Sequence, residues 1–116
     1  MENKGYCVRR LSEVEGMQCL CGTSVRLFTG NNNSAANIHV VHITDSEKHY
    51  HNECTEFYYV LDGTGKLEVG DDTVELEPGT CIIIEPGTPH RGRGNFRALI
   101  VGVPPLNDSD QIVVDR

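Results

Sequence analysis

The chain has 116 residues, of which 38% are hydrophobic and 23% are charged, a composition typical of a folded globular domain. Its formal net charge is −7, from 17 acidic and 10 basic residues, and such a surplus of negative charge repels phosphate backbones and anionic lipid headgroups. Length and charge therefore predict a single domain over residues 1–116 that binds neither nucleic acid nor membranes.

The N-terminal segment, residues 1–22, is expected to form flanking strands and turns. Its start lacks the apolar run of a secretion signal, and the longest apolar run of the chain, residues 98–103, is too short to span a bilayer. Five cysteines cannot all pair within one chain, and Cys19 and Cys21 are too close together for a zinc-knuckle pair. We therefore predict a cytoplasmic protein whose cysteines, these two included, are ordinary reduced thiols.

Short β-rich runs follow one another through the rest of the chain. They are residues 23–29, 37–43, 56–61, 65–70, 72–77, 80–85, 96–103 and 111–115. Segments rich in glycine, asparagine and proline separate these runs, and we interpret DGTG at 62–65 and RGRG at 91–94 as turns. The pattern predicts an all-β fold, a closed or sandwich-like barrel of about eight to ten short antiparallel strands.

Three histidines and a glutamate stand at positions that suit a metal site. His49 and His51 are two residues apart, so both imidazoles project from one face of an extended segment. Glu56 opens the next strand and supplies an anionic partner, and His90 follows a turn rich in proline and glycine. These donors suit manganese, iron, cobalt, nickel, copper and zinc alike, so the sequence predicts one divalent transition metal ion without selecting it.

Two motifs carry a resemblance to a known family. Residues 49–63 resemble the first motif of the cupin superfamily, and residues 79–95 resemble the second. The short spacer between them is similar to that of small single-domain bacterial cupins of the cupin 2 type. The resemblance implies a double-stranded β-helix, or jelly-roll, barrel in which His49, His51, Glu56 and His90 hold the metal.

Other polar side chains are candidates for the barrel cavity. Strand alternation puts Tyr58 on the face of the carboxylate ligand, where its phenol either acts on a bound molecule as a weak acid or packs on the wall. His39 and His42 are an odd number of residues apart, so only one of them can face the cavity. Arg26 and Arg97 lie in strands, where each either clamps a substrate carboxylate or faces outward.

Three functions agree with these residues. The first is a metal-dependent enzyme of the dioxygenase, isomerase or decarboxylase type that acts on a small oxygen-rich metabolite. The second is a non-catalytic, metal-dependent binder of a sugar or organic acid in the barrel cavity. The third is a structural role for the metal. No general base is evident beside the ligands, so the sequence leaves open whether the protein is an enzyme.

The outer face of the barrel is predicted to be an interface. Phe57, Tyr59 and Leu61 alternate with the side chains that face the cavity, and Ile82–Ile84 place branched side chains on both faces of their strand. A second subunit, or the N-terminal segment folding back, would cover this face. We predict a homodimer whose interface includes Phe57, Tyr59 and two of the isoleucines.

Overall fold

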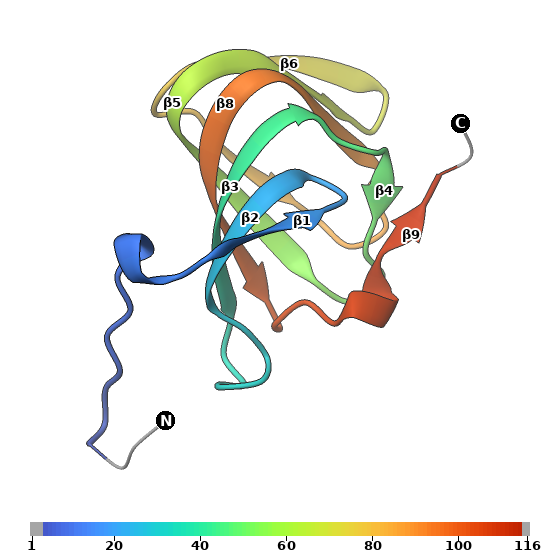
Figure 1. Ribbon diagram of the computed structural model, residues 1–116. Helices are drawn as coiled ribbons and strands as arrows, with labels where there is room; N and C mark the ends of the chain where they lie inside the picture. Colours follow the sequence, from blue (N-terminus) through green and yellow to red (C-terminus); the bar gives the residue numbers. More distant parts are fainter. Residues whose placement is uncertain (1–3, 115–116) are drawn as a thin grey trace.

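The computed structural model describes residues 4–114, which form nine β-strands and two short 3-10 helices (Figure 1). In chain order the elements are η1 (Leu11–Glu13), β1 (Gly16–Cys19), β2 (Gly22–Phe28), β3 (Asn37–Asp45), β4 (His49–Tyr50), β5 (Thr55–Val69), β6 (Asp72–Leu76), β7 (Cys81–Ile84), β8 (His90–Val103), η2 (Asp108–Asp110) and β9 (Ile112–Val113). The prediction of an all-β fold is confirmed. Over the described part of the chain, no helix is long and apolar enough to cross a membrane.

One antiparallel sheet curls around to make the barrel. The strand β8 lies at its centre, with β3 on one side and β5 on the other, and β2 and β1 continue outward from β3. Figure 1 shows β2, β3, β8 and β5 as successive curved strands. The short strand β4 pairs with both β8 and β9, so the C-terminal segment lies beside the segment that carries His49 and His51.

Two glycine-rich runs that we predicted as turns, residues 62–65 and 91–94, lie inside the paired strands β5 and β8 and meet where Gly65 is the register partner of Gly94. A Cβ atom on Gly65 would collide with the carbonyl oxygen of Arg93 and would lie 2.9 Å from the ring of Phe96. Here glycine lets two strands and an aromatic ring approach closely; it does not reverse the chain. The turn prediction was wrong because local composition does not distinguish these two uses of glycine.

The core lies between the inward faces of the long strands. Burial alternates along β3 from Asn37 to Ile43, because successive side chains of a strand point to opposite faces. The core consists of Val41, Ile43, Tyr58, Val60, Leu67, Leu76, Ile84, Phe96, Ala98 and Ile100. Among the described residues, four histidines and one glutamate are buried as well: His39, His49, His51, His90 and Glu56. Each needs a polar partner to offset its loss of water.

The outer face of β5 and β7 exposes large apolar side chains. Phe57 pairs in register with Ile83, and together with Tyr59 and Leu61 they are between 38% and 52% exposed. Of the three isoleucines of β7, only Ile83 is exposed to this extent. Ile84 lies in the core, and Ile82, on the same face of the strand, packs against the core. The prediction that two isoleucines face outward was therefore wrong.

The N-terminal segment does not provide the cover that we considered for this face. It extends away from the barrel (Figure 1), and β1 pairs with β2 at the far edge of the sheet from β7. Arg9 lies over the ring of Phe28, 5.4 Å from its centre. Tyr6 and Val8 are exposed. Within residues 4–114, the outer face of β5 and β7 is therefore open to a second subunit.

Candidate metal centre

Three histidines meet inside the barrel. His49 lies in β4 and is the cross-strand partner of His90, the first residue of β8, and His51 directly follows β4. One ring nitrogen from each lies within 4.8 Å of the others, and all three side chains are buried. The structure thus brings together the three histidines that the sequence predicted as ligands.

A backbone carbonyl holds each imidazole in place. The Nδ1 atoms of His49, His51 and His90 donate to the carbonyl oxygens of Glu47, Asp110 and Thr88 at 2.7, 2.7 and 3.0 Å. Because a carbonyl oxygen only accepts hydrogen bonds, the proton of each neutral ring lies on Nδ1, and Nε2 presents its lone pair. Metal-binding histidines are commonly oriented in this way, so the three rings are prepared for a cation at Nε2.

Glu56 brings a carboxylate to the same point from β5. Its Oε1 atom lies 3.1 Å from His51 Nε2 and 3.2 Å from His90 Nε2, and the side chain is buried. Burial alone would raise the pKa of Glu56, but the two adjacent imidazoles lower it to about 2. The carboxylate is therefore ionised at neutral pH and supplies the one negative charge of the cluster.

The same contacts separate the histidines by pKa. Burial opposes protonation of His51, but Glu56 and the carbonyl of Asp110 outweigh it and raise the pKa of this histidine. For His49, burial and the neighbouring His90 lower the pKa to about 4. At neutral pH His49 therefore offers its Nε2 lone pair without competition from a proton.

This donor set fits a divalent cation. The Nε2 atom of His90 is buried and, among the described residues, has no hydrogen-bond partner, although a carboxylate oxygen lies beside it. Lone pairs on neighbouring nitrogen and oxygen atoms repel one another unless a proton or a cation lies between them. Three imidazole nitrogens and a carboxylate oxygen are ligands that first-row transition metals accept.

The family model of the cupin domain matches residues 38–101, which contain all four of these side chains. The chain belongs to the cupin family. This result confirms the resemblance found in residues 49–63 and 79–95, and the curled antiparallel barrel is the fold of the cupin structures that it resembles.

Known proteins show how far the similarity extends. An uncharacterized protein of Methanocaldococcus jannaschii, MJ1618, is 32% identical over 72 residues, which are 59% of this chain and 56% of that protein's length. The match thus spans only about half of that relative. A crystal structure of a protein from Planctomyces limnophilus is 28% identical, with a TM-score of 0.88 over 94% of this chain and 97% of that one. The Streptomyces nucleoside dehydratase Pac13 has the same fold, with a TM-score of 0.83 and 17% identity over 94% and 91% of the two chains.

A narrow cavity of about 20 Å³ adjoins the histidines of this cupin, enough for one water-sized group. Cys21 lines it, with its Sγ atom 3.9 Å from His49 Nε2. From the sequence, Cys21 is expected to be an ordinary thiol, because its spacing to Cys19 matches no zinc knuckle. The hairpin between β1 and β2 turns at residues 20–21 and carries the thiol to the site. The available signal was a cysteine directly before Gly22, at the end of a segment expected to form strands and turns.

Tyr58 lies next to the candidate metal centre. It is buried in the core, its ring centre is 6.1 Å from that of His90, and its hydroxyl interacts with the Cys21 thiol. Burial, together with the nearby Glu56 carboxylate, raises the pKa of Tyr58 well above its ordinary value. The phenol therefore keeps its proton, and its role as a proton donor stays a prediction that Tyr58→Phe can test.

The structure decides between the paired candidates for the cavity wall. His39 is buried and lines the cavity, whereas His42 is exposed. Arg26 lines the cavity as well, whereas Arg97 lies on the exterior and forms an ion pair with Asp62. Burial, followed by the charge of Arg26, lowers the pKa of His39 to about 4, so this imidazole is neutral at pH 7.

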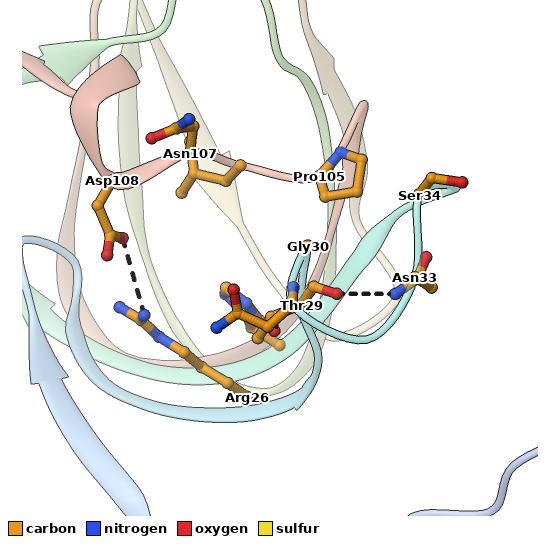
Figure 2. Close-up of a pocket in the computed structure, with 11 residues that line it drawn as sticks. Arg26, Thr29, Gly30, Asn33, Ser34, Pro105, Asn107 and Asp108 are labelled. Carbon is orange, nitrogen blue, oxygen red and sulfur yellow. Dashed lines mark hydrogen bonds and ion pairs between the residues drawn. The ribbon is translucent and has the colours of Figure 1, made fainter. Parts of the chain in front are cut away.

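A second pocket, of about 560 Å³, opens next to the narrow cavity (Figure 2). Arg26, His39 and Leu106 line both spaces. The other lining residues are Thr29, Gly30, Asn31, Asn33, Ser34, Pro105, Asn107 and Asp108. We call this space the outer pocket. Because it shares three lining side chains with the narrow cavity, the outer pocket adjoins the space beside the histidines.

Proposed function

We propose that this cupin binds one divalent transition metal ion through His49, His51, Glu56 and His90 and acts on a small oxygen-rich metabolite. One observation carries the proposal: three imidazoles, each fixed through Nδ1, direct their Nε2 atoms and an ionised carboxylate to one buried point. The retention of a single carboxylate leaves about one positive charge on a divalent ion, which favours an oxygen ligand.

When bound, such an ion supplies Lewis acidity toward a carbonyl, hydroxyl or carboxylate oxygen. The residues of the chain then have separate tasks. Glu56 tunes the charge of the centre, and the carbonyls of residues 47, 88 and 110 hold the rings in one orientation. His39 and Arg26 face the substrate side of the cavity, where a neutral imidazole can accept a proton and a guanidinium can hold an anion.

An enzyme of the dioxygenase, isomerase or decarboxylase type is our first proposal. The fold also serves a nucleoside dehydratase, Pac13, which supports the use of such a barrel for small-molecule chemistry. A non-catalytic binder of a sugar or organic acid is the alternative. It is favoured by the low pKa of His39, about 4, because so weak a base accelerates proton transfer little at neutral pH.

Metal analysis tests the proposal directly. Protein purified without added metal is analysed by mass spectrometry for manganese, iron, cobalt, nickel, copper and zinc. We expect about one equivalent in the unmodified protein and less than a tenth of that in the His51→Ala and His90→Ala variants. A full equivalent in both variants would refute the assignment. Turnover of sugars, keto acids or hydroxy acids by the loaded protein then separates the enzyme from the binder.

We also propose that two copies pair through the outer face of β5 and β7, and that the protein is cytoplasmic. Exposed Phe57, Tyr59, Leu61 and Ile83 support the first proposal, since a stable interface requires a contiguous apolar patch. The reduced state expected in the cytoplasm agrees with the five free thiols of the structure. Light scattering tests the dimer, and cell fractionation tests the location.

A further inference from the structure

Unpartnered polar groups gather where the outer pocket meets the metal cavity. In residues 4–114, the buried polar atoms without a hydrogen-bond partner include Ser24 Oγ, Arg26 Nε and His39 Nε2. Ser24, Arg26 and His39 all line the metal cavity, and the last two also line the outer pocket. A buried polar group without a partner is costly, so three of them at one boundary indicate a ligand that satisfies them.

The position of Arg26 is fixed by the sheet. It lies in β2, directly across from His39 in β3, so both side chains project from the inner face of the barrel at the same level. Figure 2 shows Arg26 extending along the pocket toward Asp108. The nearest atoms of that pair are 3.8 Å apart, and the Asp108 side chain is 84% exposed. Arg26 is thus only loosely neutralised, by a carboxylate that water already solvates.

Two other polar side chains of the outer pocket, Asn33 and Asn107, already form hydrogen bonds within their own loops. Asn33 accepts from two backbone amides of its own loop and donates to the carbonyl of Thr29. Asn107 accepts from the amide and hydroxyl of Ser109. The walls therefore contribute shape and, at Pro105 and Leu106, apolar surface, while the recognition of charge falls to Arg26.

We propose that the outer pocket binds a small carboxylic acid, with its carboxylate on Arg26 and with Ser24 and His39 beside it. A guanidinium matches the two oxygens of a carboxylate, and the neutral imidazole and the hydroxyl complete the hydrogen bonds. An oxygen on the carbon next to the carboxylate then points into the narrow cavity toward His49, His51 and His90. The substrate class is a 2-oxo or 2-hydroxy acid whose side chain occupies the outer pocket.

This inference rests on the proposed function only for the direction of that second oxygen. The carboxylate subsite is made of residues outside the metal ligands, so it can be tested without metal. A volume of about 560 Å³ suits a molecule with a side chain as large as a phenyl ring. Mandelate and phenylpyruvate are therefore suitable probes, and mandelamide is the neutral control with the shape of mandelate.

Calorimetry or ligand-observed NMR with these three probes tests the subsite. We expect mandelate or phenylpyruvate to bind the unmodified protein at least tenfold more tightly than mandelamide. Arg26→Gln should weaken binding of the acids at least tenfold and remove the preference over the amide, and Arg26→Lys should be intermediate because it keeps charge but loses the fork. Arg97→Gln is the matched control, because that arginine lies on the exterior, and it should change nothing.

Asp108→Asn separates the inference from a loss of folding. It removes the carboxylate that competes for Arg26, so the acids should bind about threefold more tightly, an outcome that a damaged protein does not give.

The proposal is overturned if the acids bind Arg26→Gln as tightly as the unmodified protein, or if neither acid binds the unmodified protein. Metal bound without either acid would refute the carboxylate subsite alone. Acids bound through Arg26 in a protein that takes up no metal would refute the proposed metal function and leave the subsite standing.

Discussion

Replacing Glu56 with glutamine removes the only negative charge of the metal centre and keeps the size of the side chain. The pKa of Glu56 is lowered from 4.5 to about 2 by His51 and His90, even though burial opposes ionisation. At about 1.4 kcal/mol per pKa unit, the ionised carboxylate favours positive charge on its neighbours by roughly 3 kcal/mol. A divalent ion bound to the same nitrogens carries more charge than a proton, so this energy is a lower bound for the loss of metal binding.

Glu56→Gln should therefore weaken zinc or nickel binding by at least about two orders of magnitude, since about 1.4 kcal/mol corresponds to a factor of ten. Competition with a chromophoric chelator at pH 7.5 measures the affinity. The variant should still fold, because the glutamine amide can donate to a neutral His51 Nε2, and thermal melting of the metal-free protein checks this. Glu53→Gln is the matched control, because Glu53 is exposed and lies three residues ahead in the same segment. An affinity of the Glu56→Gln variant within threefold of the unmodified protein would refute the charge argument.

Three further predictions use other groups. Because the pKa of His51 is raised, a proton competes with a metal ion for its Nε2 atom as the pH falls. The amount of metal that the protein retains should therefore drop between pH 7 and pH 5. Unchanged retention at pH 5 would contradict ligation by histidine. His39 has its pKa lowered to about 4, so the unfolded chain binds the extra proton between pH 6.5 and 4, and stability falls as the pH is lowered through that window. At pH 5 the loss is about 2 kcal/mol, and His39→Gln should flatten that part of the stability curve measured by urea unfolding of metal-free protein. Tyr59 is exposed on the proposed interface, so Tyr59→Asp should convert the dimer to a monomer in light scattering, while the metal content stays at one equivalent. If the unmodified protein is already a monomer at micromolar concentration, the dimer is excluded.

The strand pattern and the motif residues were predictable because both follow from local chemistry. Alternation along β3 and β5 places Glu56 and Tyr58 on the inner face, as period-two burial requires. The histidine pair at 49 and 51 projects to one side for the same reason. The role of the glycines at 62–65 and 91–94 in close strand approach was not predictable, because it depends on which two strands, far apart in sequence, pair with each other.

The choice between His39 and His42, and between Arg26 and Arg97, depended on which face of each strand points into the barrel. Alternation alone does not supply this information. Alternation states only that His39 and His42 lie on opposite faces of the strand. The pairing of β3 with β8 makes His42 and Arg97 register partners, and the pairing of β2 with β3 makes Arg26 and His39 register partners that share a face. Once one of them faces the cavity, the other must as well.

The C-terminal segment lies beside both the candidate metal centre and the outer pocket. The carbonyl of Asp110 orients His51, while its carboxylate accepts from the backbone amides of Asn52 and Glu53. Two residues earlier, Asp108 stands opposite Arg26 at the edge of the outer pocket. A single turn, η2, therefore contacts both the metal-binding segment and the proposed carboxylate subsite. An acid that displaced Asp108 from Arg26 would therefore contact the same turn whose Asp110 carbonyl accepts from His51 Nδ1.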